Sequence, residues 1–232
     1  MFTGIIEATG TVVDLGPLRQ GARRLRVATE LSLAAVPLGG SVAVNGVCLT
    51  VVAKSKGKSN GRTASVRRVP AREGGRLCHF DADLGPETLA ATTLGGLRPQ
   101  ARVHLERPLR LGDPLGGHLV AGHVDGVGEV TARRPLGETL ELEVAAPRSL
   151  APYLAPKGSI TIDGVSLTIN RIRGRTFSVT LIPHTLAVTA LGSLREKSPV
   201  NLEADLLAKH VARLLTSRGL RDERPGRVRL GR

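Results

Sequence analysis

The fold is decided by the stretch Gly40-Ser-Val-Ala-Val-Asn-Gly-Val-Cys-Leu-Thr50, which recurs as Gly158-Ser-Ile-Thr-Ile-Asp-Gly-Val-Ser-Leu-Thr168 at a shift of 118 residues. Six positions are identical, and most of the others exchange Val with Ile, Asn with Asp, or Cys with Ser. Both copies are rich in β-branched residues and are bent by an Asn-Gly or Asp-Gly pair, which is typical of a tight turn between strands. Each copy therefore predicts β-structure.

The repeat extends far beyond this stretch. Leu84-Gly-Pro-Glu-Thr-Leu-Ala-Ala-Thr-Thr-Leu-Gly95 matches Leu181-Ile-Pro-His-Thr-Leu-Ala-Val-Thr-Ala-Leu-Gly192 at a shift of 97 residues, and Val103-His-Leu-Glu106 matches Val200-Asn-Leu-Glu203 at the same shift. Near the start, the shift is again 118, because Gly4, Glu7, Gly10 and Val12 match Gly122, Asp125, Gly128 and Val130. The two shifts differ by 21 residues, so the first half carries an insertion between Thr50 and Leu84. Three collinear blocks identify the chain as a tandem duplication.

Each half is expected to be all-β. Short alternating strands separated by Gly and Pro, without helical crossovers, favour one small closed antiparallel barrel per half. A helix is predicted over residues 204–216, where Leu207, Val211 and Leu214 form an apolar stripe. Because two closed barrels leave this helix no obvious internal partner, we expect it to pack between subunits. The predicted organisation is a first barrel (1–112), a second barrel (113–203), and a C-terminal oligomerisation helix with a basic tail (204–232).

Composition narrows the possible functions. Hydrophobic residues make up 41% of the chain, enough for a core, although only four residues are aromatic. The two cysteines, Cys48 and Cys78, lack the spacing of a disulfide framework or a zinc site. The start of the chain has no basic region followed by an apolar run, and no stretch approaches membrane-spanning length. A cytoplasmic protein without a membrane partner is expected.

The formal net charge of +13 is concentrated in two stretches. Residues 54–73 hold seven Lys or Arg and one acid, and residues 216–232 hold six Arg and two acids. Both are rich in Gly, Ser, Arg and Pro and lack hydrophobic periodicity, so a solvated loop and a solvated tail are expected. A contact with a polyanion is the alternative for these stretches. A nucleic-acid-binding barrel is disfavoured, because it would need aromatic platforms on its strands.

Six blocks in order resemble the riboflavin synthase family. They are Met1-Phe-Thr-Gly-Ile-Ile6, Val44-Asn-Gly-Val-Cys-Leu-Thr50, Pro86-Glu-Thr-Leu89, Gly116-Gly-His-Leu-Val-Ala-Gly-His-Val-Asp125, Ile162-Asp-Gly-Val-Ser-Leu-Thr168 and Leu181-Ile-Pro-His-Thr185. The resemblance runs from residue 1 to about residue 215 and is interrupted by the insertion.

The resemblance implies a specific transferase. It implies Greek-key barrels that each bind one 6,7-dimethyl-8-ribityllumazine, in a homotrimer whose active sites form between the first barrel of one subunit and the second barrel of its neighbour. A four-carbon unit would pass between the two lumazines to give riboflavin and 5-amino-6-ribitylamino-pyrimidinedione, without a metal or redox cofactor. Association with lumazine synthase is a further expectation. The alternative is a non-catalytic lumazine- or flavin-binding protein of the same fold.

Within that resemblance, differences between the halves suggest catalytic residues. His123 aligns with a non-ionisable residue of the first half and could abstract a ring-methyl proton or polarise a carbonyl, although it could also be structural. His118 is interpreted as strand-end structure. Cys48 and Ser166 are equivalent and could add to a ring carbon or hydrogen-bond a ring atom, or Cys48 could simply pack. Asp163 could orient a hydroxyl or imidazole, or could only form the turn.

Other residues are predicted to bind the two substrates. Thr50 and Thr168 are expected at the pyrimidine edge, with Ser41 on the same strand. The family usually carries an acidic residue before the Thr of both Pro-x-Thr blocks, as in Glu87, whereas the second block here has His184. Lys157 could meet a ring carbonyl or be a solvated lysine. The complete predicted substrate-binding set is Gly4, Ile5, Ile6, Ser41, Cys48, Leu49, Thr50, Asp83, Leu84, Gly85, Pro86, Glu87, Thr88, Gly122, His123, Val124, Lys157, Ser166, Leu167, Thr168, Leu181, Ile182, Pro183, His184 and Thr185.

Overall fold

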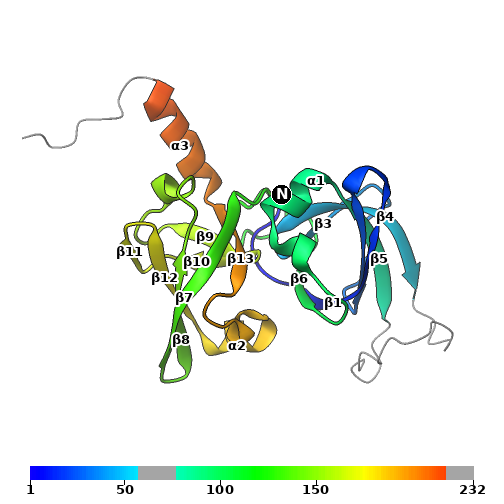
Figure 1. Cartoon of the computed structure of the whole chain (residues 1–232), viewed down its shortest axis with the longest axis horizontal. Coiled ribbons are helices and arrows are strands. Elements are labelled where there is room, and N and C mark those ends of the chain that lie inside the picture. The colour runs from blue at the N-terminus through cyan, green and yellow to red at the C-terminus, as the bar shows by residue number, and fades with distance from the viewer. Residues whose placement is uncertain (57–76, 218–232) are drawn as a thin grey trace, which may run out of the picture.

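The computed structural model describes residues 1–56 and 77–217, which form two β-barrel units side by side and a helix that follows the second (Figure 1). Most of the predicted basic insertion (54–73) and nearly all of the basic tail lie outside the described residues. Among the helices that are described, none is both long enough and apolar enough to cross a membrane.

The first unit is a closed antiparallel barrel. Its strands run in the order β1-β2-β5-β4-β3-β6, so neighbours in space are not always neighbours in sequence, which is the mark of a Greek key. The elements are β1 (Ala8–Pro17), η1 (Arg19–Gly21), β2 (Arg23–Thr29), β3 (Ser41–Val44), β4 (Val47–Lys56), β5 (Cys78–Leu84), α1 (Pro86–Ala91), η2 (Thr93–Gly96) and β6 (Arg102–Glu106).

The second unit repeats this plan as a seven-stranded sheet in the order β10-β9-β13-β7-β8-β12-β11. The strand that corresponds to β4 is split into β10 and β11. Between them, the N–H of Ile169 donates to the carbonyl of Gly158 (2.9 Å) and the N–H of Asn170 donates to the carbonyl of Ser178 (2.8 Å). These two bonds join the two ends of the sheet. The elements are β7 (Gly126–Leu136), β8 (Thr139–Ala145), η3 (Ala151–Tyr153), β9 (Ser159–Ile162), β10 (Val165–Thr168), β11 (Arg171–Arg173), β12 (Thr176–Leu181), α2 (Pro183–Val188), η4 (Leu191–Ser193), β13 (Pro199–Ala204) and α3 (Leu206–Ser217). The prediction of two tandem antiparallel barrels is confirmed.

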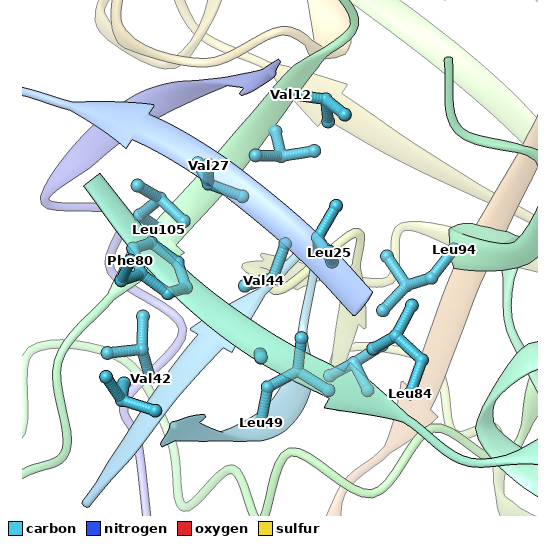
Figure 2. Close-up of a cluster of buried hydrophobic side chains, with 14 of the residues drawn as sticks. Val12, Leu25, Val27, Val42, Val44, Leu49, Phe80, Leu84, Leu94 and Leu105 are labelled. Atoms are coloured by element: carbon cyan, nitrogen blue, oxygen red, sulfur yellow. The ribbon is translucent and has the colours of Figure 1, made fainter. Parts of the chain in front are cut away.

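In each hairpin, successive residues alternate between a face that is buried in the barrel core and a face that points outward. In β3 and β4, Val42, Val44 and Leu49 lie in the barrel core (Figure 2), whereas Cys48 and Thr50 face outward. The same alternation buries four residues that were predicted to bind substrate, so their side chains fill a core and only their main chain can meet a ligand. These are Leu49, Leu84, Leu167 and Leu181.

The barrels meet through an approximate twofold arrangement of buried polar side chains. His104 Nδ1 lies 2.8 Å from the carbonyl oxygen of Asp163, and Nε2 accepts the N–H of Ala190 at 2.7 Å. Asn201, the counterpart of His104, donates from Nδ2 to the carbonyl of Asn45 at 2.9 Å. Because a main-chain N–H can only donate, Nε2 is unprotonated, and burial lowers the pKa of His104 and favours this neutral form.

Asp163 belongs to this interface. Its Oδ1 accepts the N–H of Asn201 at 2.8 Å, as Oδ1 of Asn45 accepts the N–H of His104 at 2.7 Å. Asp163 and Asn45 both adopt left-handed turn conformations, with φ of 46° and 45°. Burial raises the pKa of Asp163 to about 7. Asp163 therefore has a turn and interface role, and its predicted catalytic role stays a prediction.

Helix α3 begins two residues later than the predicted segment and ends one residue later. It contacts the η3 turn of the second barrel, and Ala212 is its buried residue. The predicted apolar stripe is solvent-exposed within one chain, with Leu207, Val211 and Leu214 exposed by 63%, 55% and 59%. The helix therefore packs against the second barrel and leaves an apolar face uncovered within the chain.

Candidate functional site

Two short segments precede the barrels, and we call them arm 1 (residues 1–7) and arm 2 (residues 118–125). They pair with each other between the barrels, where Figure 1 shows the N-terminus: the N–H of Phe2 donates to Val120 at 2.7 Å and the N–H of Val120 donates to Phe2 at 3.0 Å. Phe2 and Val120 are both buried. The pairing holds the segments that carry the predicted residues Gly4–Ile6 and Gly122–Val124.

Each arm crosses to the hairpin of the other barrel. The N–H of Ser166 in the second barrel donates to the carbonyl of Gly4 in arm 1, and the N–H of Cys48 in the first barrel donates to the carbonyl of Gly122 in arm 2, both at 2.8 Å. Ile6 packs against the core of the second barrel. Val124, equivalent to Ile6, packs against the core of the first. Each candidate pocket is therefore built from both barrels, which the sequence analysis did not predict.

Glycine is required at both crossing points. Gly4 and Gly122 have φ of +78° and +79°, where other residues are strained. A Cβ on Gly4 would lie 2.6 Å from Cβ of Ser166, and a Cβ on Gly122 would lie 2.7 Å from Cβ of Cys48. These close approaches explain why Gly4 and Gly122 match in the repeat.

A buried glutamate clamps each arm. Glu106, at the end of β6, accepts hydrogen bonds from Thr3 N (2.7 Å), Thr3 Oγ1 (2.8 Å) and Gly4 N (3.0 Å). Glu203, its equivalent in β13, accepts from Ala121 N (2.8 Å) and Gly122 N (3.0 Å). Burial raises the pKa of Glu106, and it raises the pKa of Glu203 to about 7. The sequence analysis missed both clamps, although the matched Glu in the two repeats was the available signal.

The first candidate pocket lies on the outer face of β3 and β4. Ser41 is paired with Thr50, and Cys48 lies two residues before Thr50 on the same face. Cys48 and Ser41 are half-buried, and Thr50 is exposed. Arm 2 places His123 directly after Gly122, which contacts Cys48, and the His123 side chain is solvent-exposed. The structure therefore places the main chain of His123 directly after the residue that contacts Cys48.

The second candidate pocket contains a His–Ser pair that the sequence analysis did not predict. His118 Nδ1 lies 2.8 Å from Ser166 Oγ, and His118 Nε2 is buried without a hydrogen-bond partner among the described residues. Burial is the largest influence on the imidazole and lowers the pKa of His118. A neutral His118 can accept the hydroxyl proton of Ser166, which makes the pair suitable for acid–base chemistry. The interpretation of His118 as strand-end structure alone is too limited.

Lys157 and Thr168 border the second pocket. Thr168 is paired with Ser159 on the outer face and is exposed, as Lys157 is. Lys157 has φ of +64° in a position where the first half has Gly39 at +80°. Lys157 therefore replaces a glycine at an equivalent left-handed turn position of the second half.

The Pro-x-Thr segments begin two short helices that follow β5 and β12. Pro86 and Pro183 occupy the first turns of α1 and α2, so Glu87 and His184 lie in equivalent first turns, and both are exposed. The predicted neighbours Gly85, Thr88, Ile182 and Thr185 belong to the same two segments.

Asp83 differs from its equivalent in the second half. Its carboxylate forms an ion pair with Arg24 at 2.7 Å, and hydrogen bonding to this guanidinium lowers the pKa of Asp83. At the equivalent position, Thr180 accepts a hydrogen bond from Asn170 Nδ2 at 2.8 Å. The two pockets are therefore bordered by different polar groups.

Both pocket surfaces are open within one chain. A cavity of about 460 Å³ lies between arm 1 and residues 106–116, and one of about 620 Å³ lies between the barrels, but neither is lined by Cys48 or Ser166. Across residues 1–56 and 77–217, no three His, Cys, Asp or Glu side chains are grouped as metal ligands. On the outer hairpin faces, Thr50 and Thr168 are exposed within one chain.

Sequence comparison finds relatives over nearly the full chain. The lumazine binding domain family model matches residues 3–108 and 121–205. The chain is 41% identical over 214 residues to the riboflavin synthase of Brucella abortus, spanning 92% of this chain and 98% of that protein. It is 42% identical over 222 residues to the riboflavin synthase of Mycobacterium tuberculosis, spanning 94% of this chain and 100% of that protein.

Solved structures share the fold. LumP in complex with 6,7-dimethyl-8-(1'-D-ribityl) lumazine superposes with a TM-score of 0.67 at 24% identity, covering 88% of this chain and 99% of LumP. LumP in complex with riboflavin gives the same TM-score at 25% identity and the same coverage.

Proposed function

Because the chain belongs to the lumazine-binding family of riboflavin synthases, we propose that it catalyses the dismutation of two 6,7-dimethyl-8-ribityllumazine molecules. A four-carbon unit passes from one lumazine to the other, giving riboflavin and 5-amino-6-ribitylamino-pyrimidinedione. The observation that carries this proposal is the pair of related but non-identical pockets, one with Cys48 and His123 and one with Ser166 and His118. Two identical substrates that must react differently need such a pair.

The main contribution of the pockets is to bring two substrates together in a fixed orientation. Holding two reactants in a reactive geometry can supply about 7–11 kcal/mol of the barrier. The reaction requires a proton to leave a ring methyl group and later to be returned. The acid–base groups near the two pockets are well suited to this transfer.

Ser166 and His118 form the acid–base pair of the second pocket. Neutral His118 accepts the proton of Ser166 through Nδ1, so Ser166 Oγ can in turn accept a proton from the bound lumazine. Cys48 contacts the lumazine of the first pocket. His123 projects from arm 2 into solvent and can meet a lumazine presented by a neighbouring subunit.

The remaining predicted residues bind the substrates. Ser41 and Thr50 hydrogen-bond the ring in the first pocket, and Glu87 binds ribityl hydroxyls there. Thr168 and Lys157 meet the ring in the second pocket, where the imidazole of His184 takes the place of the acid. The contributions of Leu49, Leu84, Leu167 and Leu181 come from their main chain, because their side chains are in the cores.

The active unit is a homotrimer with active sites between subunits. Two observations support this: the hairpin faces are open within one chain, and α3 exposes Leu207, Val211 and Leu214. The functional units are the first barrel (1–112), the second barrel (113–203), and the C-terminal segment (204–232). The protein acts in the cytoplasm and associates with lumazine synthase.

The decisive experiment is to incubate the purified protein with 6,7-dimethyl-8-ribityllumazine alone and to follow riboflavin by absorbance. One riboflavin should form per two lumazines without an added cofactor. Ser166→Ala should abolish most of this turnover, whereas Ser149→Ala, at an exposed serine away from both pockets, should not change it. Tight lumazine binding without turnover in the unmodified protein would support a carrier in place of an enzyme.

A further inference from the structure

Two acidic residues, Glu203 and Asp125, hold arm 2 on either side of His123, and we call this pair the acidic latch. On one side, Glu203 accepts the N–H of Gly122 at 3.0 Å. On the other side, Asp125 donates its N–H to Leu202 at 2.8 Å, and its Oδ2 accepts the N–H of Ala204 at 2.8 Å. His123 itself is exposed, so its position depends on these flanking contacts.

Helix α3 provides the cation of this latch. Lys209 Nζ lies 2.8 Å from Asp125 Oδ1, and both side chains are largely shielded, with 22% and 23% exposure. The positive charge of Lys209 also favours the ionised form of Glu203, whereas the negative charge of Asp125 opposes it. One ammonium group therefore pairs with the carboxylate of Asp125 and also influences that of Glu203, in a setting where salt screens charges less than at the surface.

The first half contains an analogous latch without a helix. Glu7, equivalent to Asp125, is bound by the N–H of Arg107 at 2.6 Å and also by its guanidinium. Arg107 directly follows the clamp Glu106 in sequence, so the strand itself carries that cation. In the second half, the cation lies on a separate element with an exposed apolar face. Helix α3 therefore supplies a cation to arm 2, whereas the cation of arm 1 comes from the residue after β6.

We propose that Lys209 is a positioning residue, which acts through Asp125 to hold the His123 segment and thereby couples the docking of α3 to the geometry of the first pocket. The catalytic consequence of this coupling rests on the proposed function. The geometric consequence, the placement of His123, does not.

The test compares three variants in the full chain. Lys209→Met removes the ammonium but keeps much of the apolar stem, and Lys209→Arg retains the charge. Arg213→Met is the matched control, because Arg213 is exposed on the same helix. With histidine labelled at Cε1, the NMR signal of His123, assigned with His123→Ala, should shift and broaden in Lys209→Met but not in Lys209→Arg or Arg213→Met.

Activity gives the second measurement. Lys209→Met should lower kcat by about fivefold, the scale of a coupling between contacting groups. Loss of the ammonium also raises the pKa of Glu203. Because the ionised carboxylate of Glu203 holds Gly122, the pH below which kcat falls should move to a higher value. Lys209→Arg should restore both values. An unchanged His123 signal in Lys209→Met overturns the positioning role, as does a loss of kcat without movement of the acidic limb. A shifted His123 signal in a protein that makes no riboflavin would instead refute only the proposed function.

Discussion

Replacing Glu106 by Gln tests whether the arms cross between the barrels. The carboxylate of Glu106 accepts two hydrogen bonds from Thr3 at Oε1 and one from Gly4 at Oε2. The amide oxygen of Gln can keep the first two, but its NH2 group then faces the N–H of Gly4, so two donors oppose each other. Leaving a buried donor unpaired, with loss of a hydrogen bond to a charged group, costs about 2 kcal/mol.

This cost should appear locally, at the strand that arm 1 contacts. Ser166 donates its N–H to Gly4, so loosening arm 1 exposes this amide to solvent exchange. A loss of about 2 kcal/mol corresponds to roughly thirtyfold faster exchange through local opening. Global unfolding should move by about 4–8 °C in Tm for a chain of this size.

Hydrogen exchange followed by mass spectrometry at pH 8 can measure this in peptides that cover the hairpins of Ser166 and Cys48. Glu203→Gln is the matched variant, because Glu203 clamps Gly122, whose carbonyl accepts the N–H of Cys48. Glu106→Gln should accelerate exchange at Ser166, in the second barrel, and Glu203→Gln should accelerate it at Cys48, in the first. If each variant instead affected the hairpin of its own barrel, or both hairpins equally, the crossed-arm architecture would be refuted.

Three further predictions concern pH, chemistry and assembly. Burial raises the pKa of Asp163 to about 7, so stability that is present at low pH is lost between pH 4 and 7, where the carboxyl group ionises in the unfolded chain and then in the folded chain. In denaturant titrations, Asp163→Asn should therefore stabilise the protein by up to about 4 kcal/mol at pH 8 and have little effect at pH 4. An equal gain at both pH values would contradict this. His118→Ala and Ser166→Ala should each reduce kcat by about 100-fold, and the double variant should be no slower than either, whereas additive losses in stopped-flow assays would exclude a shared proton path. Leu214→Glu should reduce the mass measured by light scattering, because Leu214 is 59% exposed in one chain, and an unchanged mass would argue against α3 as an interface.

Local patterns predicted most of the fold. The Asn-Gly and Asp-Gly turns and the period-two alternation identify both hairpins, because turn chemistry and face alternation are properties of adjacent residues. The same alternation, applied more strictly, excludes the side chains of Leu49 and Leu167 from the pockets. The break between β10 and β11 at Asn170 has no comparable pattern in the local sequence, because it depends on a hydrogen bond from Asn170 to Ser178 across the sheet.

The candidate site was harder to predict because its contacts are long-range. Ser166 and His118 are 48 residues apart, and the alignment of the repeats runs past the start of the chain at the position that would match His118. Glu106 and Glu203 were visible as a matched pair, but the periodicity of a strand does not say whether a glutamate is buried. The crossed arms explain why Glu106 and Glu203 occupy the same position in the two repeats, because each glutamate accepts hydrogen bonds from main-chain N–H groups of an arm.

The approximate twofold symmetry separates what folds the protein from what distinguishes its two substrates. Pairs that mirror each other, such as Gly4 with Gly122 and Glu106 with Glu203, make equivalent contacts in the two halves, as in an isologous interface. The exceptions gather at the pockets, where Ser166 rather than Cys48 has a histidine hydrogen-bonded to its side chain. Two identical lumazines can follow opposite courses only if their surroundings differ. In this chain, the duplicated contacts build the candidate pockets, and we propose that the positions that break the duplication carry the chemistry.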